Sequence, residues 1–132
     1  MSDTLKPGLT GDAEIVVGTN DTAPRIGSGR IGVMGTPVMI NLMEAAALAA
    51  VEHLLDEGQQ SLGTHLDVSH VAATPIGQKA TAEAELVEID GRTLTFAVRA
   101  HDEDGLIGEG RHKRVVVDAA RFESKLATRA KR

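Results

Sequence analysis

One stretch of the sequence, residues 38–51, constrains the fold more than any other because it is almost entirely apolar. Its only strongly polar side chains are Asn41 and Glu44, which stand among methionine, leucine, isoleucine, valine and many alanines. A helix that is apolar on all sides is buried on all sides. One small sheet cannot cover such a helix completely, so we expect either a sheet that wraps around it or a second subunit that covers the rest.

The flanking segments predict an α+β domain, an antiparallel sheet packed on this single helix. The helix begins at Thr36 or Asn41 and ends near Glu57, before Gly58. A short strand and a glycine-rich loop precede it, and four strands joined by hairpins follow, at residues 13–18, 19–35, 62–70, 79–89, 93–100 and 106–117. Asp118 is a candidate cap for a short helix over residues 119–127. We expect one domain over residues 12–128, between an N-terminal tail (1–11) and a basic C-terminal tail (129–132).

The composition argues against several classes of protein. Only 2% of the residues are aromatic, which leaves too few rings to stack nucleic-acid bases, and the net charge is −5. The chain has no cysteine, so it has no disulfide, thiolate nucleophile or cysteine metal site, and a reducing cytoplasm is the natural compartment. The longest apolar run, residues 45–51, is too short to span a membrane. We therefore expect a cytoplasmic protein without a nucleic-acid or membrane partner.

Three polar residues near the helix are candidates for chemistry. Glu44 is a carboxylate in an apolar segment, where burial without a partner is costly, so it is a candidate catalytic group. Alternatively, Asn41 and Glu44 form a capping box at the start of the helix. Thr36 before Pro37 is a normal helix start, and His70 ends the apolar face of its strand, where a histidine is more often a core residue.

Taken together, these residues resemble a known family. The similarity covers residues 36–125, and its most specific part is the block 63–77. The matching segments are Thr36–Glu44, Ser61–Thr64, His70–Gly77, Glu88–Arg92, Ala100–Asp102 and Ile107–His112. They are similar to the fluoroacetyl-CoA thioesterase family of hot-dog proteins. The resemblance implies a long helix wrapped by an antiparallel sheet, in a homodimer or higher homo-oligomer.

The resemblance also implies an active site. The family's catalytic set is a threonine at the helix start, a glutamate eight residues later and a histidine on the next strand, which places it on Thr36, Glu44 and His70. A family glycine whose backbone meets the thioester carbonyl corresponds to Gly63. The implied activity is hydrolysis of a small acyl-CoA to the free acid and CoA, without a metal or other cofactor.

The chemistry of these groups leaves the individual steps open. The Gly63 N–H and the Thr36 hydroxyl are candidate donors to the carbonyl oxygen, which becomes negative during attack. Glu44 is a candidate nucleophile or general base, and His70 would activate water or protonate the leaving thiolate. If Thr36 and Glu44 share one helix, they lie about 12 Å apart along its axis. Direct contact then requires a helix that starts near Asn41, or a Thr36 from a neighbouring subunit.

The loop over residues 25–32 differs from the fluoroacetate-specific enzyme, which is similar but has aromatic side chains over its site. This loop contains no aromatic residue, so we do not expect a preference for fluoroacetyl-CoA. Residues 27–32 spell G-x-G-x-x-G, but several loop residues separate them from the preceding strand and no second βα unit follows, as a dinucleotide site would require. We interpret the segment as a flexible lid.

Other motifs have simpler explanations. The basic run over residues 111–114 is interpreted as a solvated strand face, with CoA phosphates as an alternative ligand. His65, Asp67 and Ser69 have the identities of a catalytic triad, yet their two-residue spacing places them in parallel along one strand face. Two rival functions stay open. One is a non-catalytic acyl-CoA-binding or regulatory domain, and the other is an acyl-CoA hydratase, whose aspartate and histidine motif is not found near the helix start.

Overall fold

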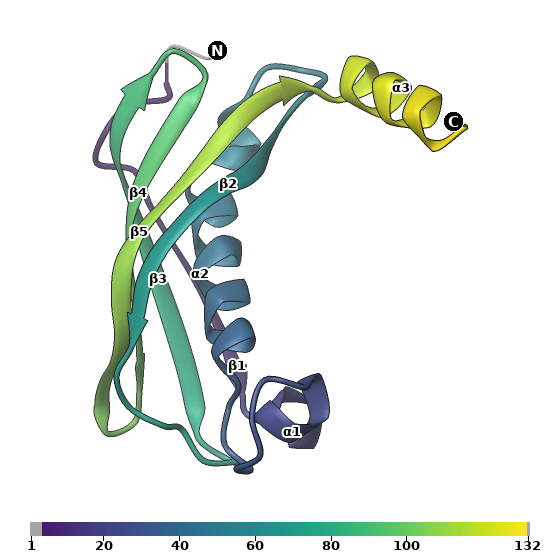
Figure 1. The fold of residues 1–132 in the computed structure, drawn as a ribbon. Helices are drawn as coiled ribbons and strands as arrows, with labels where there is room; N and C mark the ends of the chain where they lie inside the picture. The colour runs from purple at the N-terminus through teal and green to yellow at the C-terminus, as the bar shows by residue number, and fades with distance from the viewer. Residues whose placement is uncertain (1–3, 132) are drawn as a thin grey trace.

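The computed structural model describes residues 4–131 and contains one sheet of five antiparallel strands, which curves around one side of a long helix (Figure 1). In chain order the elements are β1 (Thr10–Val16), the 3₁₀ helix η1 (Thr19–Asp21), α1 (Ala23–Ile26), α2 (Thr36–Val51), the 3₁₀ helix η2 (Glu52–Leu54), β2 (Gln59–His70), β3 (Lys79–Asp90), β4 (Thr93–Asp102), β5 (Gly105–Asp118) and α3 (Ala119–Ala130). The expected α+β class and its elements are confirmed, with shifted ends.

The strands do not pair in chain order. Their order is β1-β3-β4-β5-β2, so β3–β4 and β4–β5 are hairpins as predicted, whereas β2 pairs with β5 at the edge of the sheet. The prediction of a hairpin between β2 and β3 is therefore wrong. The connection explains why: Met34 donates its N–H to the carbonyl of Thr74, and Val33 bridges to Pro75. The chain that leaves β2 thus pairs with the segment before α2 instead of turning back on itself.

Helix α2 begins at Thr36, directly after Gly35, and Pro37 occupies its second position, where no N–H partner is needed. Asn41 therefore lies inside the helix, and the capping box predicted for Asn41 and Glu44 does not form. The helix ends at Val51 and η2 follows, so it is shorter than the predicted segment to Glu57.

The apolar side of α2 packs on the sheet and forms the core. Its buried residues are Met39, Leu42, Met43, Ala46, Ala47, Ala50 and Val51. The sheet contributes small side chains such as Ala80, Ala82 and Ala84 of β3, and Gly11 of β1 lies so close to the backbone of α2 that a side chain would not fit. Close approach between helix and sheet explains the high alanine content of this core.

The sheet covers only one side of α2. On the opposite side, Asn41 is exposed, and Glu44, Ala45 and Leu48 are half-buried. Together with η2, the helix forms a 19-residue segment that is apolar and long enough to cross a membrane. Helices in the core of soluble proteins have the same composition, and here packing on the sheet accounts for the apolar residues on the buried side of the segment.

Both ends of the chain contribute structure. Leu5 is buried, and Gly8 and Leu9 form backbone hydrogen bonds with Leu86, so part of the segment interpreted as a tail packs on the sheet. At the other end, the Asp118 carboxylate accepts a hydrogen bond from the N–H of Arg121 and caps α3, as predicted. Helix α3 runs further than expected, to Ala130, and projects away from the sheet with none of its residues buried (Figure 1).

Candidate active site

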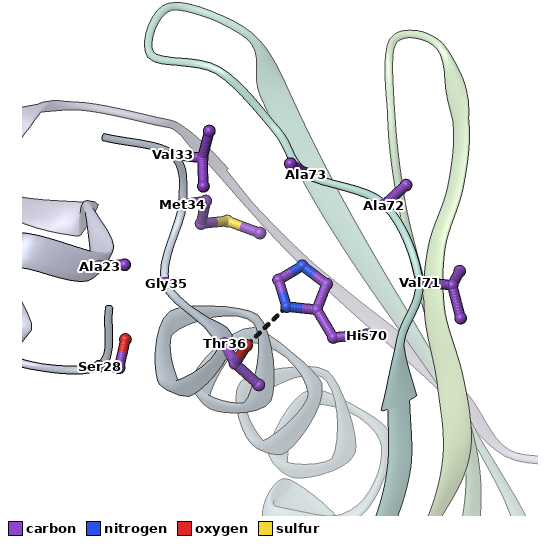
Figure 2. Close-up of a pocket in the computed structure, with 10 residues that line it drawn as sticks. All are labelled: Ala23, Ser28, Val33, Met34, Gly35, Thr36, His70, Val71, Ala72 and Ala73. Atoms are coloured by element: carbon purple, nitrogen blue, oxygen red, sulfur yellow. Dashed lines mark hydrogen bonds between the residues drawn. The ribbon is translucent and has the colours of Figure 1, made fainter. Parts of the chain in front are cut away.

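A threonine and a histidine meet at the start of α2. Thr36 is the first residue of this helix and His70 is the last residue of β2, and the Thr36 Oγ1 lies 2.7 Å from the His70 Nδ1 (Figure 2). The two side chains line a pocket of about 310 Å³, together with the segments 33–35 and 71–73. A hydroxyl in hydrogen-bond contact with an imidazole is the arrangement that activates an oxygen nucleophile.

His70 is placed to act as a base. Burial lowers the pKa of His70 below its usual 6.5, and the neighbouring backbone of Ala72 offsets part of that effect. The ring is therefore neutral at neutral pH. Its other nitrogen, Nε2, is buried without a hydrogen-bond partner in the described part of the chain. A neutral ring with Nδ1 facing the Thr36 hydroxyl can take up the hydroxyl proton.

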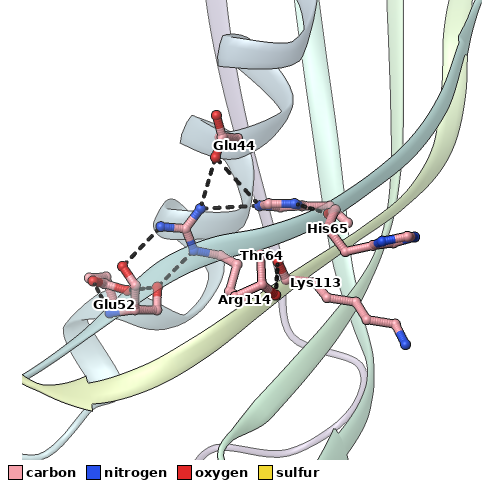
Figure 3. Close-up of polar contacts among 8 residues, drawn as sticks. Glu44, Glu52, Thr64, His65, Lys113 and Arg114 are labelled. Carbon is pink, nitrogen blue, oxygen red and sulfur yellow. Dashed lines mark hydrogen bonds and ion pairs between the residues drawn. The ribbon is translucent and has the colours of Figure 1, made fainter.

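Glu44 lies two turns further along α2 and faces a cation. Its Oε2 is 3.4 Å from the Arg114 Nη1 (Figure 3). The same oxygen is 3.9 Å from the His112 Nε2. The Glu44 side chain is 36% exposed, whereas Arg114 and His112 on β5 are buried. Glu44 lies in the third turn of α2, which excludes a role in capping the start of the helix. Arg114 is the ionic partner that a carboxylate in an apolar segment needs.

The basic run on β5 is divided between the two faces of the sheet. Arg111 and Lys113 are exposed, but His112 and Arg114 point inward toward α2. The interpretation of residues 111–114 as a solvated face is thus wrong for these two. Alternation along the strand places every second residue inside, and the sequence did signal this, since His112 and Arg114 are spaced by two.

Gly63 brings β2 close to Glu44. A side chain at this position would place its Cβ 2.6 Å from the Glu44 Oε2 and 3.1 Å from the His112 Cε1. The register between β2 and β5 shifts directly after it, between Gly63 and His65, which is a β-bulge. The structure thus places Gly63 beside Glu44, where its backbone role toward a thioester carbonyl remains a prediction.

The predicted residues form two separate groups within one chain. Thr36 and His70 are in contact, and Glu44 and Gly63 are in contact with each other. Because α2 is helical from Thr36 onward, the two groups are about 12 Å apart along its axis, and a fold-back before Asn41 does not occur. His65, Asp67 and Ser69 are exposed, and residues 27–32 form a loop after α1, next to an antiparallel sheet that provides no dinucleotide site. Among residues 4–131, no three His, Asp or Glu side chains gather to hold a metal ion.

A curved antiparallel sheet around one long helix, with a paired threonine and histidine at the helix start, defines a hot-dog thioesterase. Solved structures agree. A hypothetical protein of Thermus thermophilus, described as a thioesterase superfamily member, is 27% identical with a TM-score of 0.84, covering 98% of this chain and 95% of its own. A hot-dog-like protein from Thermanaerovibrio acidaminovorans shares the fold at 23% identity and a TM-score of 0.85, with 95% and 93% covered.

The chain belongs to the family of fluoroacetyl-CoA-specific thioesterases, whose model matches residues 17–120. The fluoroacetyl-CoA thioesterase of Streptantibioticus cattleyicolor is 43% identical over 94 residues, which are 71% of this chain and 68% of that protein. A solved structure of the fluoroacetyl-CoA thioesterase FlK is 34% identical with a TM-score of 0.89, and the match covers 96% of this chain and 98% of FlK. The resemblance noted in the sequence and the expected fold are thereby confirmed.

Proposed function

We propose that this thioesterase hydrolyses the thioester of a small acyl-CoA and releases the free acid and CoA. The observation that carries the proposal is the 2.7 Å contact between the Thr36 Oγ1 and the His70 Nδ1 beside a pocket. The activity named for the relatives supports the substrate class, as does a structure of an FlK variant in complex with acetyl-CoA, at 33% identity. A domain that only binds acyl-CoA has no use for a paired hydroxyl and imidazole.

In the proposed mechanism, Thr36 and His70 act as nucleophile and base. The imidazole takes the hydroxyl proton while the Thr36 Oγ1 attacks the thioester carbon, and the C–S bond breaks. The departing CoA thiolate receives that proton and leaves an acyl ester on the threonine. A water molecule, deprotonated by Glu44, then attacks the ester, and the bond between the acyl carbon and the Thr36 Oγ1 breaks. The proton held by Glu44 passes to the Thr36 oxygen, which regenerates the hydroxyl and releases the free acid. The Gly63 N–H stabilises the negative oxygen in both steps.

This mechanism needs the two groups of residues side by side, and we infer that a homodimer provides this. Strand β2 lies at the sheet edge with one side open to pairing, and Leu62 and Leu66 on it are exposed. Two copies of β2 paired antiparallel about a two-fold axis at Asp67, with the bulge residue Thr64 left out of the ladder, would place Gly63 of one copy opposite His70 of the other. Glu44 of one chain would then face Thr36 and His70 of its partner. A cytoplasmic location, supported by the absence of cysteine, completes the proposal.

A thiol-release assay on a panel of short acyl-CoAs tests the function. We expect turnover of acetyl-CoA and similar substrates, loss of turnover in Glu44→Gln, and a loss of about 100-fold or more in His70→Ala. Ser69→Ala is the matched control, because Ser69 is the exposed neighbour of His70 on β2. We expect no strong preference for fluoroacetyl-CoA over acetyl-CoA, because the loop at residues 25–32 has no aromatic side chain. Full activity in both site variants would refute the assigned site, and binding without turnover by the wild type would favour the non-catalytic alternative.

A mixing experiment tests whether the site is shared between subunits. Thr36→Ala and Glu44→Gln are each expected to be inactive alone. In a mixed dimer, one of the two sites would combine an intact Thr36 with an intact Glu44 from the other chain. Because about half of the dimers in a random mixture are mixed, roughly a quarter of the wild-type activity should return. If both residues of a site came from one chain, co-refolding of the two variants would restore nothing.

A further inference from the structure

His112 has no part in the proposed mechanism, although it is a completely buried histidine next to the site. Its ring packs on Phe96, with ring centroids 6.2 Å apart and planes inclined by 28°. The His112 Nδ1 lies 2.9 Å from the backbone carbonyl oxygen of His65. A carbonyl oxygen can only accept a hydrogen bond, so Nδ1 must carry the proton. The fold thereby fixes one tautomer of this ring.

The opposite nitrogen of His112 faces Arg114. The distance between the His112 Nε2 and the Arg114 Nη1 is 3.1 Å. Arginine can only donate, so this contact is a hydrogen bond only if Nε2 has a free lone pair, which is the case in the neutral ring with its proton on Nδ1. The two contacts of His112 therefore require the same protonation state.

Arg114 is held on its other side by Ser61. The Arg114 Nε donates to the Ser61 Oγ at 2.7 Å, and Nη2 donates to the Ser61 carbonyl at 3.0 Å. Ser61 is itself fixed by Glu52, which accepts from the Ser61 hydroxyl at 2.6 Å and from its N–H at 2.9 Å. The guanidinium is thus held on two sides, and Nη1 is directed at the Glu44 Oε2. The other carboxylate oxygen, Oε1, makes no hydrogen bond or ion pair in the described residues.

We propose that His112 is a positioning residue, which in its neutral form holds Arg114 so that the guanidinium fixes the orientation of the Glu44 carboxylate. This rests on the proposed function, because it assigns a purpose to the geometry of Glu44. Protonation of His112 would replace the acceptor at Nε2 with a donor, facing the Arg114 cation at 3.1 Å and the Glu44 carboxylate at 3.9 Å. Arg114 would lose a partner, and Glu44 would gain a second cation.

The surroundings favour the neutral form at neutral pH. Burial is the main effect that lowers the pKa of His112, and the positive charge of Arg114 and the neighbouring His65 side chain act in the same direction. The His65 carbonyl and the Glu44 carboxylate act in the opposite direction and do not outweigh it. The titratable and charged groups that face the ring are thus Arg114 on β5, His65 on β2 and Glu44 on α2.

Two substitutions at this position separate positioning from packing. In His112→Gln, the amide reaches the place of Nε2, so its oxygen can accept from Arg114. His112→Asn reaches only the place of Nδ1 and loses that acceptor. We expect kcat to fall about tenfold or more in His112→Asn with KM little changed, because a misoriented carboxylate impairs the reaction more than binding, and His112→Gln to recover most of it. His101→Gln, at a half-buried histidine of β4 that contacts Glu83 on β3, is the control. Equal kcat in the Asn and Gln variants would overturn the proposal.

A measurement on the unmodified enzyme does not depend on how the variants fold. Nitrogen chemical shifts of the histidine rings should show His112 neutral with its proton on Nδ1 at neutral pH. A charged ring, or a proton on Nε2, would contradict the proposal. The pH profile adds a third readout, because the acid limb of kcat in His112→Gln should lose one ionisation relative to the wild type. Failure of the proposed function is distinguishable, since it would appear as full activity in Glu44→Gln whatever the state of His112.

Discussion

The side chains of the site form one neutral pair and one charged pair. Thr36 and His70 form the neutral pair at the start of α2, and Glu44 and Arg114 form the charged pair two turns away. Sequence analysis predicted three of these four residues and missed Arg114. Alternation along the strand predicts that His112 and Arg114 share one face and that Arg111 and Lys113 share the other, but only the tertiary structure shows which of the two faces points inward.

The sequence predicts that the Thr36 hydroxyl, like the Gly63 N–H, donates a hydrogen bond to the carbonyl oxygen of the substrate. Its contact with His70 supports the proposed role of Thr36 as the nucleophile. We expect Thr36→Ala to reduce kcat about 100-fold or more, because the proposed nucleophile is removed. Thr36→Ser retains the hydroxyl and should keep activity within about tenfold of the wild type, since only the orienting methyl group is lost. Steady-state kinetics with the best acyl-CoA decide this. If the Ala and Ser variants lose activity equally, the hydroxyl is not the reacting group.

Among the elements, β2 determines how the site is built. The sequence predicts that His70 ends the apolar face of this strand, and regular alternation would place Leu62 and Leu66 on the same face. The bulge between Gly63 and His65 breaks that alternation: Leu62 pairs with Val115 on the outer side, whereas Leu66 pairs with the inward-facing His112. An extra residue in a strand has no reliable sequence signal except a glycine nearby, so the predicted face was correct only after the bulge.

The close approach of β2 to α2 at Gly63 leads to a specific prediction. In Gly63→Ala, the new methyl group would lie 2.6 Å from the Glu44 Oε2, so the carboxylate must move away from Arg114. The backbone of Gly63 does not lie in the left-handed region, so alanine is compatible with the fold. We expect kcat to fall about tenfold or more with little change in melting temperature.

Thr64→Ala is the control for this variant, because Thr64 is the exposed residue of the same bulge. Its hydroxyl donates to the Lys113 carbonyl and does not contact Glu44. Unchanged kcat in Gly63→Ala would show that the position of Glu44 tolerates displacement.

For the whole molecule, the stability of the fold is linked to pH through its two inward-facing histidines. Burial lowers the pKa of both His70 and His112 in the folded chain, whereas in the unfolded chain each titrates near 6.5. Below that pH the unfolded chain binds more protons than the folded one, so acid favours unfolding. The contribution of the two histidines to the free energy of unfolding is complete above pH 6.5, and it is lost as the pH falls toward their lowered pKa values.

We therefore expect the melting temperature to decrease as the pH is lowered from neutral toward 5, with no comparable change between neutral pH and 8. His112→Gln should show a smaller decrease over the same range, because one of the two ionisations is removed. Differential scanning fluorimetry with an extrinsic dye is suitable, since the chain has no tryptophan or tyrosine. A variant as acid-sensitive as the wild type would exclude His112 as a source of the pH dependence.

The placement of Thr36 and Glu44 on one uninterrupted helix restricts which changes of chain length the protein can accept. One residue inserted between them would rotate everything beyond it by about 100° and shift it by about 1.5 Å, so that if one of the two kept its partner, the other would lose it. An insertion in the loop at residues 27–32 would have no such effect, because that segment precedes the helix. Among related chains, length differences should therefore accumulate before Thr36 and not between Thr36 and Glu44, whatever substitutions the helix itself accepts.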